Sequence, residues 1–384
     1  MSARFYGNTK IQVALTDKTQ EDKEHFMQKR LEKAKKKLSE LGADALYVTS
    51  EINARYLTGF DFSDGSVLIT KNESYVLTDF RYIEAAKKSI TGGYNVIVPD
   101  RAKGDYLENL CRENDVKSLA FEDNVLSYAG YQYLKKRLPG IELVCAGSLI
   151  EDLRLYKDAE EVENIIAAQR IAEQAFAELL PEIRAGRTET ELAAELEYRM
   201  KRLGAEDISF KTICVSGTAS ALPHGVPRNI PIERGFLTFD FGAVVNGYHS
   251  DMTRTVVVGR ADDEMRRIYN TVLKAQLAAE AVIAEGYKNA DADKVARDII
   301  DEAGYKGCFG HSLGHGVGLM IHEAPGLHAR AGDAVLEVGQ IVTVEPGIYI
   351  EGKYGCRIED MMEIIPGGAR NLTNCPKELI EIPV

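Results

Sequence analysis

The pattern of hydrophobic residues changes once along this chain, around residues 150 to 165. Before that point, short β-like runs alternate with amphipathic helical stretches, which is typical of a small α/β domain. After it come long amphipathic helices and strand-rich segments punctuated by glycine. A chain of 384 residues is also longer than one ordinary hydrophobic core supports. We therefore expect two domains, over residues 1–155 and 156–384.

Four long helices are expected in the second domain. Thr188 precedes one of them, and Glu191 follows three residues later, which is the spacing of a capping box. The expected helical segments are 153–180 after an initial connector, 188–203, 262–285 and 291–303.

The net charge, the cysteine spacing and the lengths of the apolar runs limit the partners and cofactors that this chain can have. Asp and Glu number 59 against 47 Lys and Arg, so the formal net charge is −12. Such a charge repels nucleic acid and anionic membranes, and we expect neither as a partner. The six cysteines form no CxxC pair, which fits a cytoplasmic protein and argues against a thiolate zinc site. No apolar run approaches the ~20 residues that a membrane-spanning helix needs.

Two carboxylates are expected to meet on a β-hairpin. The dipeptide Asn246-Gly247 between two β-rich runs predicts a two-residue turn. If the residues flanking this turn pair with each other, Asp240 and Asp251 share one face as diagonal neighbours, with Gly242 between them. Because two close carboxylates repel each other, we expect a cation there. A strand pair with one solvent-exposed face is the alternative.

Histidines are concentrated late in the chain, since six of the seven follow residue 220. Three of them, His311, His315 and His322, lie in a glycine-rich segment, 310–326. The glycines disfavour a helix, and the HExxH order of a zinc peptidase is absent. We expect these side chains to converge from loop and strand, one as a metal ligand and the others as proton carriers or hydrogen-bond donors. A purely structural role is the alternative.

The segment 341–364 contains two β-like runs joined by a glycine-rich turn at 352–355. Glu345 follows an Ile-Val-Thr-Val run, where a carboxylate is costly to bury unless it is paired or bound to a metal. Arg357 and Glu359 share one face of the second run. The alternative to a metal ligand is a salt bridge from Arg357 to Glu345 or Glu359.

Together these segments supply four carboxylates and one imidazole, from Asp240, Asp251, His315, Glu345 and Glu359. This oxygen-rich set suits two divalent ions such as Mn²⁺, Co²⁺, Fe²⁺ or Zn²⁺ better than a single structural zinc. Two ions ~3.5–4 Å apart can activate a shared water and stabilise the oxygens of a tetrahedral intermediate. Hydrolysis of an acyl bond is the expected reaction.

The motifs that carry these residues resemble those of the creatinase/prolidase group of pita-bread metallopeptidases, and specifically its bacterial Xaa-Pro aminopeptidases and Xaa-Pro dipeptidases. NARYLTGF and TDFRY resemble the group's first domain, and ALPHG, DFGAVVNGYHSDMTRT, GHSLGHGVGLMIHE, VEPGIYI and RIED its catalytic domain. The resemblance covers essentially the whole chain. It implies a creatinase-like α/β N-terminal domain, an α+β pita-bread catalytic domain and a homodimer.

The resemblance also implies a role for each ligand. Asp240 would be a terminal ligand of one metal, and Asp251 would bridge the two. His315 and Glu345 would bind the other metal, and Glu359 would bridge both. Glu345 would also carry the proton of the bridging water. Two divalent ions per subunit are implied, with Mn²⁺ as the first candidate.

Four more residues match positions that contact the substrate in this family. His224 and His322 match histidines that hydrogen-bond the scissile amide and its developing oxyanion. His311 matches a histidine on the proline side, and Arg357 an arginine beside the second bridging glutamate. His224, His322 and Glu345 form the expected catalytic set, and the expected substrates are peptides with proline at the second position.

The substrate class depends on one departure from the family pattern. Many strict dipeptidases of the family read HExPR, with an arginine that holds the C-terminal carboxylate of the dipeptide. Gly326 stands at that position here. We therefore expect an Xaa-Pro aminopeptidase. Arg330 or Arg357 could take over the arginine's role, so an Xaa-Pro dipeptidase is the alternative. A non-catalytic binding module is disfavoured because all five ligand positions are retained.

Overall fold

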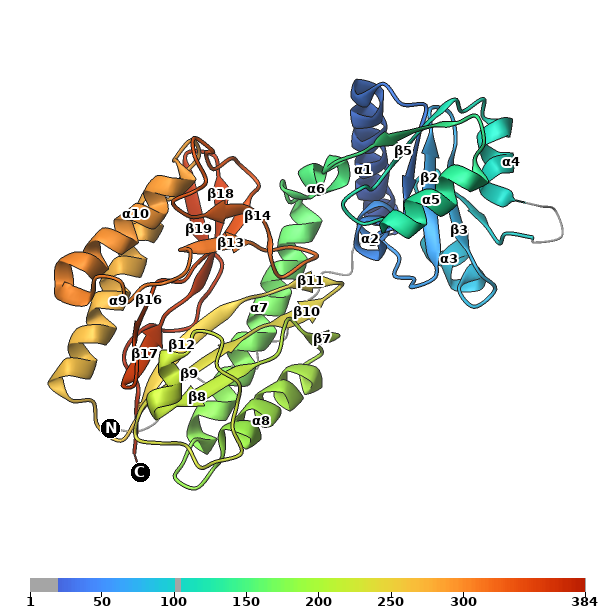
Figure 1. The fold of residues 1–384 in the computed structure, drawn as a ribbon. Coiled ribbons are helices and arrows are strands. Elements are labelled where there is room, and N and C mark those ends of the chain that lie inside the picture. Colours follow the sequence, from blue (N-terminus) through green and yellow to red (C-terminus); the bar gives the residue numbers. More distant parts are fainter. Residues whose placement is uncertain (1–19, 101–104, 384) are drawn as a thin grey trace. The chain divides into compact units, whose positions relative to one another are not determined.

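The computed structural model describes residues 20–100 and 105–383, which form two compact units (Figure 1). The first unit ends at Arg154, and the second begins at Leu155. Within the described ranges, no helix combines the length and the apolar run that crossing a bilayer requires.

The first unit is an α/β domain, as its alternating pattern predicts. Its sheet has the order β4-β3-β2-β1-β5-β6, in which β1, β5 and β6 are parallel and β2 is antiparallel to both of its neighbours. The strands are β1 (Ala45–Val48), β2 (Gly65–Thr70), β3 (Ser74–Thr78), β4 (Asn95–Ile97), β5 (Ser118–Phe121) and β6 (Glu142–Cys145). The helices are α1 (Gln20–Leu41), α2 (Glu51–Thr58), α3 (Ile83–Ser89), α4 (Tyr106–Glu113), α5 (Tyr128–Arg137) and α6 (Leu149–Arg154).

The NARYLTGF motif has a structural role within this unit. The amide nitrogen of Asn53, a fully buried residue of α2, donates to Glu122 at 2.7 Å and to Glu151 at 3.0 Å. Its amide oxygen accepts from Arg154 at 2.8 Å. Because all of its polar atoms have partners, Asn53 links α2 to α6 and to the end of β5.

The second unit contains the four predicted long helices, arranged in two pairs. They are α7 (Ala159–Leu179), α8 (Glu189–Arg202), α9 (Asp263–Val282) and α10 (Asn289–Ile300). The predicted capping box opens α8: the Thr188 hydroxyl accepts from the Glu191 amide at 3.1 Å, and the Glu191 carboxylate accepts from the Thr188 amide at 2.9 Å. Helix α7 packs on α8, and α9 packs on α10.

The described strands of this unit form four sheets, with the orders β11-β10-β7, β20-β12-β9-β8, β14-β13-β15-β18-β19 and β16-β17. The strands before residue 300 are β7 (Asp207–Ile208), β8 (Ile213–Ser216), β9 (Gly235–Phe241), β10 (Ala243–Val245), β11 (Tyr248–His249) and β12 (Met252–Val258). Those after it are β13 (Gly314–Gly316), β14 (Glu323–Leu327), β15 (Ile341–Val344), β16 (Gly347–Ile350), β17 (Tyr354–Arg357), β18 (Asp360–Ile365), β19 (Gly368–Asn371) and β20 (Glu381–Ile382).

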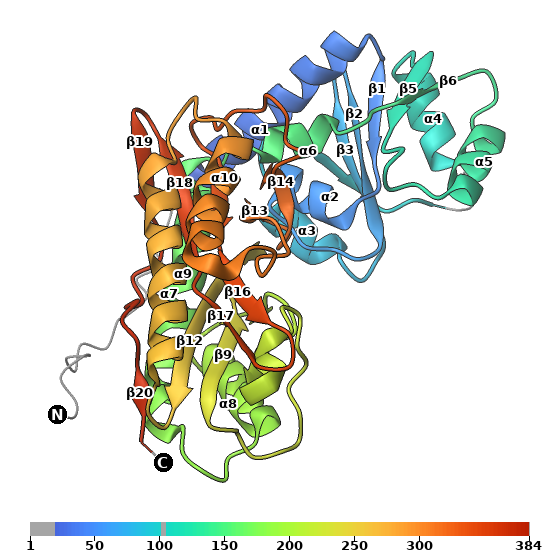
Figure 2. The same ribbon diagram turned by 60° about the vertical axis from the view of Figure 1, so that its left-hand side comes forward.

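Two hydrophobic cores hold the second unit together. Leu237 and Val256 belong to the core beneath α7 and α8, whereas Phe236 and Val257 belong to the core beneath α9 and α10. Successive side chains of a strand point to opposite faces. Strands β9 and β12 therefore lie between the two helix pairs, an α+β arrangement (Figure 2).

The predicted hairpin is confirmed. Asn246 and Gly247 have φ values of 48° and 77°, in the left-handed region that asparagine and glycine tolerate. The turn joins β10 to β11, and β12 continues along β9 with Thr253 opposite Asp240. Gly242 is required at this point, because a Cβ there would lie 1.8 Å from the carbonyl oxygen of Ser250, between β11 and β12.

The segment 341–364 was expected to form two β-like runs. The structure shows four short strands in it instead of two long ones, so the expectation is wrong in this respect. Each run is split into two strands of different sheets, β15 and β16 in the first run and β17 and β18 in the second. The first break contains Pro346, which has no N–H to continue a ladder. Glu345 and Glu359 lie at the two breaks, where the chain passes from one sheet to another.

Candidate active site

The predicted site residues surround one cavity of about 510 Å³ within the second unit. All nine line it: Asp240, Asp251, His315, Glu345 and Glu359, together with His224, His311, His322 and Arg357. Nine residues spread between positions 224 and 359 of the sequence thus line one cavity.

Each expected metal ligand comes from a strand or from its immediate end. Asp240 is near the end of β9, and Asp251 directly precedes β12. His315 is the central residue of β13, Glu345 follows β15, and Glu359 precedes β18. Since these strands are held in sheets, the ligands have rigid supports, as a metal centre requires.

The distances between these side chains suit a shared cation. Nε2 of His315 lies 3.6 Å from a carboxylate oxygen of Asp251 and 3.4 Å from one of Glu345. One ligand atom each of Asp251, His315 and Glu359 lie within 4.8 Å of one another. Nδ1 of His315 is 3.0 Å from the carbonyl oxygen of Gly316. A proton on Nδ1 would satisfy that contact and leave the Nε2 lone pair for a metal.

Two buried oxygen atoms at this centre need a partner. Oδ1 of Asp240 and Oδ1 of Asp251 have no hydrogen-bond donor among residues 20–100 and 105–383. A buried carboxylate oxygen without a donor is costly unless a cation compensates it. The donor set therefore fits the divalent ions that the sequence predicts.

Burial and mutual repulsion also shift the pKa values of these groups. Burial, followed by repulsion from neighbouring carboxylates, raises the pKa of Asp251 and of Glu359 well above the usual range. Burial raises the pKa of Glu345 to about 8. Burial lowers the pKa of His315 to about 4, which keeps the imidazole neutral near pH 7. Divalent cations would offset the repulsion and favour the ionised carboxylates.

The alternative of a salt bridge from Arg357 to Glu345 or Glu359 is wrong, because its ion-pair partner is a different carboxylate. Nη2 of Arg357 donates to Asp240 at 2.6 Å, and the arginine side chain is only 3% exposed. Its Nε donates to the Thr253 hydroxyl at 3.0 Å. The guanidinium therefore orients one oxygen of Asp240 and leaves Oδ1 of the same carboxylate for a cation.

Three residues at the site were missed by the sequence analysis. The hydroxyl of Tyr349 lies 2.9 Å from Nε2 of His311 and accepts from Arg357 at 2.6 Å. The Thr253 hydroxyl donates to Glu359 at 2.7 Å, and the Thr343 hydroxyl to Glu345 at 3.3 Å. Tyr349 stands in VEPGIYI, and the two threonines share strand faces with expected ligands, so a search of those faces would have found all three.

Two of the residues expected to contact substrate are more exposed than the expected ligands. His224 and His322 are exposed on the cavity lining, and the rings of His322 and His315 are 4.3 Å apart. Lys211 also lines the cavity and is exposed. Arg330 instead lines a neighbouring cavity of about 610 Å³, which shares His311 and Ser312 with the first.

A neighbouring side chain fills the space beside Gly326. A Cβ atom at Gly326 would lie 2.7 Å from the imidazole of His328. The histidine ring thus occupies the space into which a side chain at position 326 would project. An arginine at this position would require His328 to move.

Comparison with known proteins agrees with both units. Residues 163–366 match the model of metallopeptidase family M24, and residues 30–156 match the creatinase/prolidase N-terminal domain. An Xaa-Pro dipeptidase from Pyrococcus furiosus is 38% identical over 357 residues, which is 92% of this chain and all of the relative.

Two solved structures are similar over nearly the whole chain. A structure of an Xaa-Pro dipeptidase from Bacillus anthracis has 42% identity and a TM-score of 0.89, covering 93% of this chain and 100% of that one. A structure of an X-Pro aminopeptidase from Thermotoga maritima has 36% identity and a TM-score of 0.84, covering 92% and 99%. The chain therefore belongs to metallopeptidase family M24, with a pita-bread catalytic domain that follows a creatinase/prolidase-type α/β domain.

Proposed function

We propose that this metallopeptidase is an Xaa-Pro dipeptidase, which hydrolyses the single peptide bond of dipeptides ending in proline. The observation that carries the proposal is its similarity, over more than nine tenths of the chain, to relatives that bear this name. These relatives favour the alternative that the sequence analysis left open over its main expectation of an aminopeptidase.

The proposed metal centre holds two divalent ions per subunit, with Mn²⁺ as the first candidate and Co²⁺, Zn²⁺ or Fe²⁺ as the others. The proposed ligands are Asp240, Asp251, His315, Glu345 and Glu359. When bound, such ions supply Lewis acidity and lower the pKa of a water molecule at the reaction centre. The orphaned oxygens of Asp240 and Asp251 support this assignment.

We assign proton transfer, stabilisation of the oxyanion and contact with the substrate to side chains that line the cavity. Glu345 would accept a proton from the attacking water and return it to the leaving proline nitrogen. His224 and His322 would donate hydrogen bonds to the scissile carbonyl and to the oxyanion that develops from it. His311 and Tyr349 would contact the proline ring, and Arg357 would hold Tyr349 and Asp240 in place.

A dipeptide also presents a free carboxylate, for which the cavity offers a cation. Arg357 is buried against Asp240 and Tyr349, so its donors are committed. Lys211 is exposed on the lining, and no ion pair joins it to another residue of the described part of the chain. We therefore assign the recognition of a substrate carboxylate to Lys211. In relatives with the HExPR pattern this role belongs to an arginine, and Gly326 stands at that position here.

An Xaa-Pro aminopeptidase is the second candidate. Gly326 favours it, because the position lacks the arginine that matches strict dipeptidases. The similarity to the X-Pro aminopeptidase of Thermotoga maritima supports it as well. In that case the substrates would be longer peptides with proline at the second position.

Steady-state kinetics on matched substrates separates the two candidates. The set is an Xaa-Pro dipeptide, the same dipeptide with a C-terminal amide, and the Xaa-Pro-Yaa tripeptide. We expect kcat/KM for the dipeptide to exceed that for either of the others by about tenfold or more. The amide has no negative charge to pair with the cation, and the tripeptide carries its carboxylate one residue further from the scissile bond. Faster cleavage of the tripeptide would replace the proposal by the aminopeptidase. Cleavage of none of the three would exclude both.

We also propose a homodimer, on the basis of the family resemblance alone. Light scattering of the purified protein tests it, with twice the 42.4 kDa chain mass as the expected result and a single chain mass as the contradictory one.

A further inference from the structure

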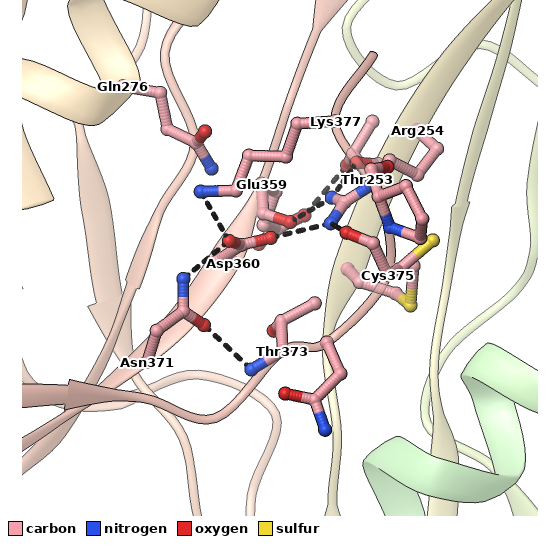
Figure 3. Close-up of polar contacts among 12 residues, drawn as sticks. Thr253, Arg254, Gln276, Glu359, Asp360, Asn371, Thr373, Cys375 and Lys377 are labelled. Carbon is pink, nitrogen blue, oxygen red and sulfur yellow. Dashed lines mark hydrogen bonds and ion pairs between the residues drawn. The ribbon is translucent and has the colours of Figure 1, made fainter. Parts of the chain in front are cut away.

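A buried arginine, Arg254, and a buried aspartate, Asp360, lie next to Thr253 and Glu359 of the site (Figure 3). The side chain of Arg254 is 3% exposed and that of Asp360 is fully buried, and Nη2 of the arginine donates to Oδ1 of the aspartate at 2.8 Å. Each follows a residue of the site in the sequence, Thr253 in one case and Glu359 in the other. The two adjacent pairs therefore connect the centre to the interior of the unit.

The backbone geometry places these pairs back to back. Thr253 faces the centre, where its hydroxyl donates to Glu359 at 2.7 Å, and the Glu359 amide donates to the Thr253 carbonyl oxygen at 3.2 Å. Because successive side chains of extended backbone alternate, Arg254 and Asp360 project to the opposite side. Thr253 and Glu359, the front pair, are thus joined by a hydroxyl–carboxylate hydrogen bond. Arg254 and Asp360, the rear pair, are joined by an ion pair.

All five N–H groups of the Arg254 guanidinium have acceptors, which is the full capacity of an arginine. Nη1 donates to the carbonyl oxygen of Thr253 at 2.9 Å and to that of Glu359 at 2.7 Å. The other three acceptors are Oδ1 of Asp360 and the carbonyl oxygens of Cys375 and Pro376. A single nitrogen atom therefore ties together the main chain of the two residues that face the metal centre.

The aspartate is held as firmly as the arginine. Its second oxygen, Oδ2, accepts from Lys377 at 2.6 Å and from Asn371 at 2.6 Å (Figure 3). Lys377 also donates to Glu280 at 2.7 Å. Since these donors come from β19 and from the segment after it, the C-terminal part of the chain braces the rear of the centre.

We propose that Arg254 and Asp360 are positioning residues of the metal centre. By fixing the main chain at Thr253 and Glu359, they set the distance between the Glu359 carboxylate and that of Asp251, two residues before Thr253. Neither side chain touches the cavity, so neither is a catalytic residue. The proposal rests on the proposed metal ligands and is independent of the substrate class.

The experiment measures Mn²⁺ binding to the metal-free full-length protein by titration calorimetry, for the wild type and for Asp360→Asn and Arg254→Lys. Outer residues that orient metal ligands typically change metal affinity by about 10–100-fold, and we expect a loss of that size in the Kd of at least one site. Electron paramagnetic resonance of the loaded protein is expected to change from a coupled Mn²⁺ pair toward isolated ions. Thermal unfolding of each metal-free variant is recorded in parallel.

Arg170→Lys is the matched control. Nη2 of Arg170 donates to the carbonyl oxygen of Leu372 at 2.8 Å, and its ion-pair partner Glu173 accepts from the Asn374 amide at 2.6 Å. It therefore holds the same C-terminal segment without contacting Thr253 or Glu359. We expect this control to lower the unfolding temperature with the Mn²⁺ affinity unchanged.

Folded Asp360→Asn and Arg254→Lys variants with the wild-type Kd and the wild-type spin coupling would overturn the proposal. An equal loss of affinity in the Arg170→Lys control would also overturn it, by reducing the effect to general stability. If both rear variants fail to fold, Lys377→Met removes one donor to Asp360 from a partly exposed position, and unchanged Mn²⁺ binding in that variant would count against the proposal. Failure of the wild type to bind two ions would instead refute the metal centre itself.

Discussion

At the scale of single residues, the active site depends on side chains that serve several partners at once. Arg357 donates to Asp240, Thr253 and Tyr349, which belong to three different strands. Burial alone would lower the pKa of Arg357, but the surrounding acidic groups raise it well above its ordinary value, so the guanidinium stays charged. Only a planar group with several fixed donors can satisfy these partners together.

The first prediction therefore concerns Arg357→Lys, which keeps the charge and removes the planar fork. We expect kcat/KM to fall by about 100-fold or more, because one ammonium cannot orient Asp240 and Tyr349 at the same time. Arg370→Lys, which alters an arginine paired with Glu363 outside the cavity, is the control and should retain wild-type kinetics. Wild-type kcat/KM in the Arg357→Lys variant would show that the hydrogen bonds from the guanidinium to Asp240 and Tyr349 are dispensable.

A second prediction at this scale concerns Lys211→Met. If Lys211 meets the carboxylate of the substrate, the variant should raise KM for the dipeptide roughly tenfold, since that is the worth of one partly exposed ionic contact in recognition. The C-terminal amide of the same dipeptide should be unaffected. Equal losses for the acid and the amide would remove carboxylate recognition from Lys211.

At the scale of elements, short loops are held at both ends so that they present site residues. Glu189, the first residue of α8, is fully buried and accepts from the amide and hydroxyl of Ser216, both at 2.7 Å. It also accepts from Arg228 at 2.9 Å. Ser216 and Arg228 bracket the loop that carries His224, so one carboxylate closes that loop.

This contact predicts a pH-dependent contribution to stability. Burial alone would raise the pKa of Glu189, but the hydrogen bonds from Arg228 and Ser216 outweigh it and lower the pKa below its ordinary value of 4.5. A lowered folded-state pKa means that the contribution is complete above about pH 4.5 and is lost as the pH falls through the folded-state value.

Glu189→Gln should therefore lower the free energy of unfolding by about 2 kcal/mol near neutral pH, the usual worth of hydrogen bonds to a charged group. The difference from the wild type should shrink as the pH falls below the ordinary pKa. Urea unfolding across this pH range measures it. A difference that grows on acidification would contradict the assignment.

Glycines in the segment 310–318 offer a test of backbone crowding at the same scale. A Cβ atom at Gly314 would lie 1.9 Å from the carbonyl oxygen of Thr343, whereas a Cβ at Gly310 would meet no atom within 4 Å. We expect Gly314→Ala to destabilise the fold by about 3 kcal/mol or more and Gly310→Ala to stay within about 0.5 kcal/mol of the wild type. Similar unfolding midpoints for the two variants would contradict this account.

At the scale of the whole molecule, local patterns in the sequence predicted the α/β first unit and the four long helices of the second, because periodicity and capping are local. The convergence of the five expected ligands was predicted differently, from their residue types and from the resemblance of their motifs to a known family. The split of the 341–364 segment between two sheets was not predicted, because alternation looks the same in one long strand and in two short ones. The partner of Arg357 is 117 positions away, and a contact at that separation has no local signal.

The most direct test of the metal centre is anomalous diffraction from crystals of the full-length protein loaded with Mn²⁺, collected at the manganese absorption edge. We predict two peaks per subunit, about 3.5–4 Å apart, among Asp240, Asp251, His315, Glu345 and Glu359. A single peak, or peaks outside this group of side chains, would contradict it.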